Sequence, residues 1–205
     1  MTKKRVAVLI SGRGSNMVAL IEAAQGKDYP AEIALVLSNQ PDAAGLTRAR
    51  DAGIVAAVVD HRQFSDDREA FERSLDEELR KYRIELICLA GFMRLLTSWF
   101  IRRWRGRILN IHPALLPQFK GLHTHRRALD AGVKQHGATV HFVVEETDAG
   151  PVILQQSVPV SESDTEETLA ARVLAIEHRI YPEALRLVAE GHVKFAGACD
   201  EACAR

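Results

Sequence analysis

The chain has 205 residues, 47% of them hydrophobic, and carries 27 basic against 27 acidic side chains. This length and apolar content suit one domain, residues 1–205, with a sizeable core. A formal net charge of zero gives no reason to expect a nucleic acid or an anionic membrane as partner. We therefore expect a protein that works on small molecules.

Cysteine usage and the ends of the chain indicate the compartment. Three cysteines do not make a secreted disulfide framework, and Cys88 lies inside an apolar run, as a core residue would. Cys199 and Cys203 are expected to be free thiols in a flexible tail that begins at about residue 194. The apolar stretch after the basic start is too short for a signal peptide, and no segment suits a bilayer. We therefore expect a cytoplasmic protein.

Short apolar runs alternate with amphipathic stretches along the first half of the chain. The predicted strands are residues 5–10, 31–38, 55–59, 86–90 and 108–112, and the predicted helices are 16–24, 44–52, 67–82 and 97–104. This alternation is typical of an α/β fold with a doubly wound, mostly parallel sheet.

The second half of the chain changes the pattern. Runs at 138–144 and 152–160 are joined by too few residues for a parallel crossover, so they predict an antiparallel C-terminal strand pair. A long helix is expected from about residue 165 to 190, with Leu169, Val173, Ile176 and Ile180 on its buried face and Gly191 as its stop.

A glycine-containing loop follows the first predicted strand and opens the first predicted helix. In Ser11-Gly12-Arg13-Gly14-Ser15-Asn16, backbone N–H groups and the helix dipole would converge on a bound anion. Met17 stands where a dinucleotide fingerprint has its third glycine, so a monophosphate suits the loop better than a pyrophosphate. The alternative is a tight turn with no ligand.

The strongest chemical signal is Asn110 and His112 at the end of a predicted strand. Residues two apart on a strand share a face, and Pro113 should end the strand there, at the edge where open α/β sheets bind ligands. Asp148 follows in a turn-prone segment. An amide donor, an imidazole and a carboxylate that favours the imidazolium suit acyl transfer through an oxyanion. Taken singly, each residue could instead be a cap or a structural side chain.

Four segments of the chain occur together, and in this order, in one known family. They are residues 10–16, Ala90-Gly91-Phe92-Met93-Arg94, Asn110-Ile111-His112-Pro113 and Gly150-Pro151-Val152-Ile153. Over about residues 5–192 the chain closely resembles phosphoribosylglycinamide formyltransferase, a folate-dependent enzyme of purine synthesis. The resemblance implies transfer of a formyl group from the cosubstrate 10-formyltetrahydrofolate to the amine of glycinamide ribonucleotide, with small-molecule partners and no metal. It leaves the oligomeric state open, a homodimer included.

The resemblance also assigns individual residues. Asn110, His112 and Asp148 match the catalytic trio. The substrate-binding positions are Gly14, Ser15, Asn16 and, near the ribose, Glu177. The folate-binding positions are Arg68, Met93, Arg94, Leu95, Leu96 and again Asn110. The Leu116–Pro117 bond resembles one that is cis in the family. From the residues alone, Glu177 could be a solvated helix carboxylate and Arg68 an exposed charge.

Several other interpretations compete. His123 and His125, with the distant His112 or Asp148, could hold a metal, but a loop with a helix start at Thr124 fits the sequence better. The basic, Trp-containing run at 101–107 could bind nucleic acid, or be a solvated helix face. The function could also be that of another enzyme that uses formyltetrahydrofolate, either a hydrolase or methionyl-tRNA formyltransferase. We expect neither, because each of these enzymes carries a further domain in addition to a core like this one. A non-catalytic phosphate-binding module is the third alternative.

Overall fold

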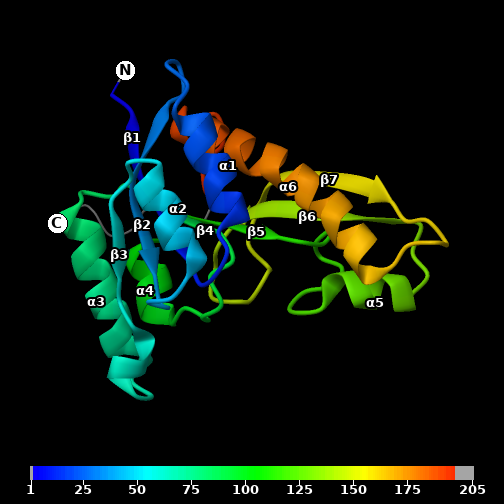
Figure 1. Ribbon diagram of the computed structural model, residues 1–205, viewed down its shortest axis with the longest axis horizontal. Helices are drawn as coiled ribbons and strands as arrows, with labels where there is room; N and C mark the ends of the chain where they lie inside the picture. Colours follow the sequence, from blue (N-terminus) through cyan, green and yellow to red (C-terminus); the bar gives the residue numbers. More distant parts are fainter. Residues whose placement is uncertain (1, 197–205) are drawn as a thin grey trace.

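The computed structural model describes residues 2–196, which form a mixed sheet with helices on both faces (Figure 1). The strands are β1 (Lys4–Ile10), β2 (Ala31–Ser38), β3 (Ala56–Val58), β4 (Leu86–Leu89), β5 (Ile108–His112), β6 (Gln135–Phe142) and β7 (Val152–Pro159). The helices are α1 (Ser15–Ala24), α2 (Ala44–Asp51), the 3-10 turn η1 (His61–Phe64), α3 (Arg68–Lys81), α4 (Ser98–Arg103), α5 (Thr124–Asp130) and α6 (Glu166–Ala189). Within residues 2–196, no helix is both long and apolar enough to cross a membrane.

The strand order is β3-β2-β1-β4-β5-β6-β7. The first five strands pair in parallel, and β6 pairs antiparallel with both β5 and β7. The doubly wound, mostly parallel sheet is confirmed, and so is the antiparallel C-terminal pair. The sequence did not indicate that β6 also lies against β5, because register between distant strands is set by tertiary packing.

Two apolar layers cover the sheet. One packs α1, α2 and α6 against one face, through residues such as Met17, Leu46 and Leu169. The other packs α3 and α4 on the opposite face, through Phe71 and Phe100. Figure 1 shows α1 and α6 on one side of the strands and α3 and α4 on the other. Strands buried on both faces are near-continuous apolar runs, which is why β1 and β4 stand out in the sequence.

Helix α6 packs across the sheet and is hydrogen-bonded to the central strands β4 and β5. Thr165 caps its start in a reciprocal box with Thr168, and the four apolar side chains predicted for its buried face are buried. Tyr181 is fully buried, and its hydroxyl lies 2.9 Å from the carbonyl of Leu89 and 3.1 Å from that of Leu109. The helix is therefore hydrogen-bonded to both β4 and β5 near their carboxyl ends.

Some local details differ from the sequence prediction. Strand β3 is shorter than expected, η1 was not predicted, and β6 begins at Gln135 and ends at Phe142 instead of spanning 138–144. In the expected tail, Phe195 packs its ring against Phe142 with centroids 5.5 Å apart. The predicted free thiols Cys199 and Cys203 lie outside the described residues.

Candidate active site

Three loops with functional residues emerge at one edge of the sheet. Because β1, β4 and β5 are parallel and β4 lies between the other two, the segments that follow them are neighbours. These are the phosphate loop at 11–16, the segment 91–97, and the strand end at Asn110 and His112 with the loop after it. The structure therefore brings together residues that are a hundred positions apart in the sequence.

Two of the three predicted catalytic residues, His112 and Asp148, are in contact. Nδ1 of His112 lies 3.4 Å from Oδ2 of Asp148; His112 is buried and Asp148 is half-buried. Asp148 has a backbone φ of 51°, and it precedes Gly150, where a Cβ atom would lie 1.7 Å from the carbonyl oxygen of Phe142. Only glycine permits this close approach, which brings the turn of Asp148 against the end of β6.

His141 completes the cluster and was missed by the sequence analysis. It pairs with Asn110 across β5 and β6, and its Nε2 lies 3.3 Å from Nδ2 of Asn110 and 3.6 Å from Oδ1 of Asp148. Its Nδ1 lies 2.9 Å from the carbonyl oxygen of Phe142 and donates to it. With Nδ1 directed to the Phe142 carbonyl, Nε2 is the ring nitrogen that accepts from the Asn110 amide. His141 could have been found from the β5–β6 register, which the sequence did not reveal.

The surroundings of His112 and Asp148 shift their proton affinities. Burial lowers the pKa of His112, and the Phe119 carbonyl and the Asp148 carboxylate oppose this without overcoming it. The expected influence of Asp148 on His112 is present, but desolvation outweighs it. Burial alone would raise the pKa of Asp148, yet the adjacent His141 ring, the hydrogen bond from the Gly121 N–H and the nearby His112 ring bring it below its usual value.

The loop after β5 folds over the cluster. Nε2 of His112 lies 3.0 Å from the carbonyl oxygen of Phe119, and the N–H of Gly121 donates to Oδ2 of Asp148 at 2.9 Å. The loop contains the expected cis bond between Leu116 and Pro117, and α5 begins at Thr124 as predicted. In this arrangement both ring nitrogens of His112 face oxygen atoms of the protein.

The phosphate loop leaves backbone donors available. Gly14, with a φ of 70°, is the N-cap of α1, and no side chain caps this helix. The first N–H groups of a helix have no partner within it, so those of α1 are free to bind an anion. The loop packs closely on α2, because the N–H of Gly45 donates to the Gly12 carbonyl at 3.0 Å and a Cβ at Gly45 would meet Ile10 at 2.5 Å.

Asn16 and Glu177 bind each other beneath this loop. Nδ2 of Asn16 donates to Oε2 of Glu177 at 2.6 Å, and both side chains are buried. Burial raises the pKa of Glu177, opposed by the Asn16 amide. Glu177 is therefore not a solvated helix carboxylate, and it adjoins the loop through Asn16. Oδ1 of Asn16 is buried without a partner among the described residues.

The segment assigned to folate lies at the end of β4. Met93 and Leu95 are 69% and 64% exposed, which is unusual for large apolar side chains beside a buried strand. The guanidinium of Arg94 lies 5.7 Å from the ring centre of Phe71, and Arg68 is exposed at the first residue of α3, three positions before that phenylalanine. Two cationic groups thus lie near Phe71. Leu96, the last residue assigned to folate, is half-buried.

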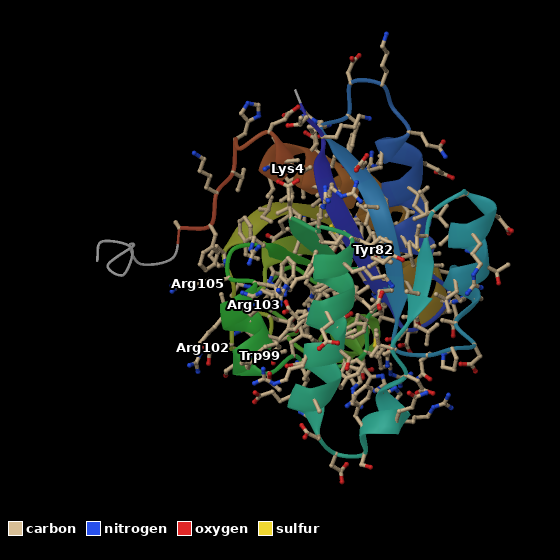
Figure 2. All side chains as sticks on the ribbon, turned by 90° about the vertical axis from the view of Figure 1, so that its left-hand side faces the viewer. Lys4, Tyr82, Trp99, Arg102, Arg103 and Arg105 are labelled. Carbon is tan, nitrogen blue, oxygen red and sulfur yellow. The ribbon has the colours of Figure 1, made fainter. Side chains whose placement is uncertain are left out.

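The histidines considered for a metal site and the basic run considered for nucleic acid both contact neighbouring side chains of the protein. His125 contacts His136 edge-to-face at 5.3 Å, and no group of three or more His, Cys, Asp or Glu in residues 2–196 has an arrangement that could hold a metal. Arg102, Arg103 and Arg105 lie along α4 and the turn after it (Figure 2). Arg102 pairs with Glu145 and Arg103 with Asp76, which favours the solvated-face interpretation of this run.

Comparisons with known proteins identify the family of the chain. A family model described as formyl transferase matches residues 4–185. Phosphoribosylglycinamide formyltransferase of Escherichia coli (strain K12) is 48% identical over 92% of this chain and 89% of its own length. The crystal structure of phosphoribosylglycinamide formyltransferase from Brucella melitensis has a TM-score of 0.88 at 51% identity, covering 98% of this chain and 100% of that one.

A longer relative shows the same segment within a larger protein. The trifunctional purine biosynthetic protein adenosine-3 of Bos taurus is 51% identical over 94% of this chain, but the chain spans only 19% of that protein. Together these matches define the class first: the chain belongs to the formyl transferase family. Within that class, it belongs to the phosphoribosylglycinamide formyltransferase family. The family uses 10-formyltetrahydrofolate as formyl donor.

Proposed function

We propose that the chain transfers the formyl group of 10-formyltetrahydrofolate to the amine of N1-(5-phosphoribosyl)glycinamide, a step of purine biosynthesis. The observation that carries the proposal is the cluster of buried His112 and His141 with half-buried Asn110 and Asp148, beside an uncapped helix terminus. An anion site next to a proton-handling site suits a phosphorylated acceptor whose amine must lose a proton.

The reaction proceeds by direct attack. The amine nitrogen bonds to the formyl carbon, the bond from that carbon to the folate nitrogen breaks, and a proton passes from the amine to the departing folate nitrogen. The four side chains of the cluster include no Ser or Cys, so no acyl-enzyme forms on them. Negative charge develops on the formyl oxygen, and stabilising it is the main catalytic task.

Asn110 and His112 supply donors to that oxygen. One N–H of Asn110 is directed to His141, which orients the amide and leaves its other N–H for the substrate. The Nε2 position of His112 faces the Phe119 carbonyl, so a formyl oxygen that displaces this carbonyl receives the same N–H. Asp148 lies beside the other nitrogen of His112, where its charge favours the imidazolium form, and it takes up the proton of the amine, directly or through water.

The two substrates occupy the flanking loops. The phosphate binds the backbone of residues 12–16, including Gly14, Ser15 and Asn16, and Glu177 faces the ribose. The pterin lies against the backbone of Met93, Arg94, Leu95 and Leu96, which are assigned by the family resemblance. Arg68 and Arg94 are suited to the carboxylates of a folate because both are cationic and lie near Phe71.

One experiment separates this function from its rivals. The purified protein is offered 10-formyltetrahydrofolate with glycinamide ribonucleotide, with initiator methionyl-tRNA, or with water alone, and deformylation is followed. We expect turnover with the ribonucleotide only. Turnover with the tRNA or with water would identify another formyltetrahydrofolate enzyme, and no turnover with any acceptor would leave a phosphate-binding module.

We further place the enzyme in the cytoplasm, with these small molecules as its partners. The buried, free thiol of Cys88 is consistent with a reducing compartment. Sedimentation velocity at assay concentration distinguishes a monomer from a homodimer.

A further inference from the structure

The hydroxyl of Ser11 joins the two loops to which the two substrates are assigned. Ser11 directly precedes the glycines of the phosphate loop, and its Oγ accepts a hydrogen bond of 2.8 Å from the N–H of Met93, the first residue of the folate segment. The N–H of Ser11 in turn donates to the carbonyl of Gly91 at 3.1 Å. The loops after β1 and β4 are therefore bound to each other twice at this one residue.

A third strand end orients this hydroxyl. The Ser11 hydroxyl donates to Oδ1 of Asn39 at 2.6 Å, and Asn39, which directly follows β2, is buried. The carbonyl of Asn39 accepts from Nδ1 of His61 at 2.9 Å. Because the hydroxyl donates to one fixed partner and accepts from another, it has a single orientation.

The other end of the folate segment is held independently. Glu72, buried on α3, accepts a 2.6 Å hydrogen bond from the N–H of Thr97 and a second one from the Thr97 hydroxyl. The exposed side chains of Met93 and Leu95 lie between these two attachments. Only the attachment at Met93 contacts the phosphate loop, so the two ends can be tested separately.

We propose that Ser11 is a positioning residue that couples the binding of the two substrates. A phosphate bound on residues 12–16 fixes the loop and hence Ser11, and Ser11 fixes the Met93 amide at the start of the folate segment. Such coupling is reciprocal, so each ligand raises the affinity for the other by the same factor. One shared neutral hydrogen bond supports a factor of about three- to tenfold.

The inference rests on the proposed function, and calorimetry with two ligands that cannot react tests it. Glycinamide ribonucleotide and tetrahydrofolate, which has no formyl group, are titrated separately and then each in the presence of saturating amounts of the other. We expect about three- to tenfold tighter binding of each in the presence of the other. Failure of the wild-type protein to bind either ligand alone would overturn the proposed function. Normal separate binding with a coupling factor of one would overturn only this inference.

Variants assign the coupling to the hydroxyl. In Ser11→Ala the factor should fall to about one, and Ser11→Thr, which keeps a hydroxyl, should restore it. Glu72→Gln is the matched control: it should weaken tetrahydrofolate binding equally with and without ribonucleotide and leave the factor unchanged. If Ser11→Ala does not fold, Asn39→Ala removes the acceptor that orients the same hydroxyl and should lower the factor. Wild-type coupling in the folded Ser11 or Asn39 variant contradicts the proposal.

Discussion

The two polar regions at the carboxyl edge of the sheet are built in opposite ways. Around Asp148, buried side chains from β5, β6 and two loops already bind one another. At the start of α1, backbone donors are left without caps. A side chain that transfers a proton needs an orientation that is fixed before the substrate binds. An anion site instead needs hydrogen-bond donors that stay without a partner until the anion binds. Changes in the first region should therefore affect turnover, and changes in the second should affect binding.

The largest effect is expected for Asp148→Asn. The amide cannot accept the amine proton or favour a charged His112, so kcat should fall on the order of a thousandfold, while both KM values change little. Single-turnover kinetics measure the first effect. Histidine NMR titration should show the His112 pKa falling further below its usual value, because a carboxylate that raises it is lost. An unchanged rate would reduce Asp148 to a turn former.

Removing a hydrogen-bond donor from the same cluster should lower kcat by a somewhat smaller factor. Either Asn110→Ala or His112→Ala should lower kcat about a hundredfold or more, because each removes a hydrogen bond that strengthens as charge develops on the formyl oxygen. Steady-state kinetics with both substrates provide the measurement. Near-normal turnover of His112→Ala would rule out its role as a donor.

The open region should respond in the opposite manner. Gly14→Val places a side chain at a φ of 70°, where a Cβ lies 3.1 Å from Met17 and 3.2 Å from Gly45, and so distorts the loop. We expect the KM for the ribonucleotide to rise about tenfold or more, and the KM for the folate to change far less. Gly53→Val is a matched control, because this glycine also has a positive φ but lies at the end of α2 with open space around its Cβ. Equal effects on both KM values in Gly14→Val would contradict the assignment of the loop.

The smallest expected effect concerns stability in acid. Burial lowers the pKa of His136, at the start of β6, to about 4. The folded protein keeps this ring neutral, whereas the unfolded chain takes up a proton below about pH 6.5, so the stabilising contribution is full above pH 6.5 and is lost as pH falls toward 4. The loss should amount to about 3 kcal/mol in the free energy of unfolding. Urea titrations between about pH 7 and 4.5 should show a shallower dependence for His136→Gln, and parallel dependences would contradict the shift.

The sequence predicted those parts of the fold that depend on local pattern. Buried parallel strands such as β1 and β4 are continuous apolar runs, and α6 has a capped start and a periodic buried face, so both kinds of element could be recognised. β3 has three residues and only partly buried or exposed side chains, so its bounds could not be predicted. The strand pairing of β5 with β6 depends on packing across the molecule and left no local signal.

The same distinction holds for the site. Asn110 and His112 share a strand face, which spacing alone reveals, and Asp148 was linked to them by a family motif. His141 joins them only through the β5–β6 register, and Glu177 meets Asn16 across 161 residues. The Ser11–Met93 contact spans 82 residues and involves a backbone donor, which no side-chain pattern encodes. Contacts of this kind become visible only in the folded chain.

The position of α6 in the chain has a consequence for biosynthesis. This helix follows every strand of the described sheet, yet Glu177 holds Asn16 of the phosphate loop and Tyr181 holds the carbonyls of Leu89 and Leu109 beside the catalytic strand end. During translation the sheet can emerge and begin to pack before these two side chains exist. A nascent chain that ends before Glu166 therefore lacks supports for both candidate substrate regions, and these regions are complete only once α6 has left the ribosome and packed on the sheet.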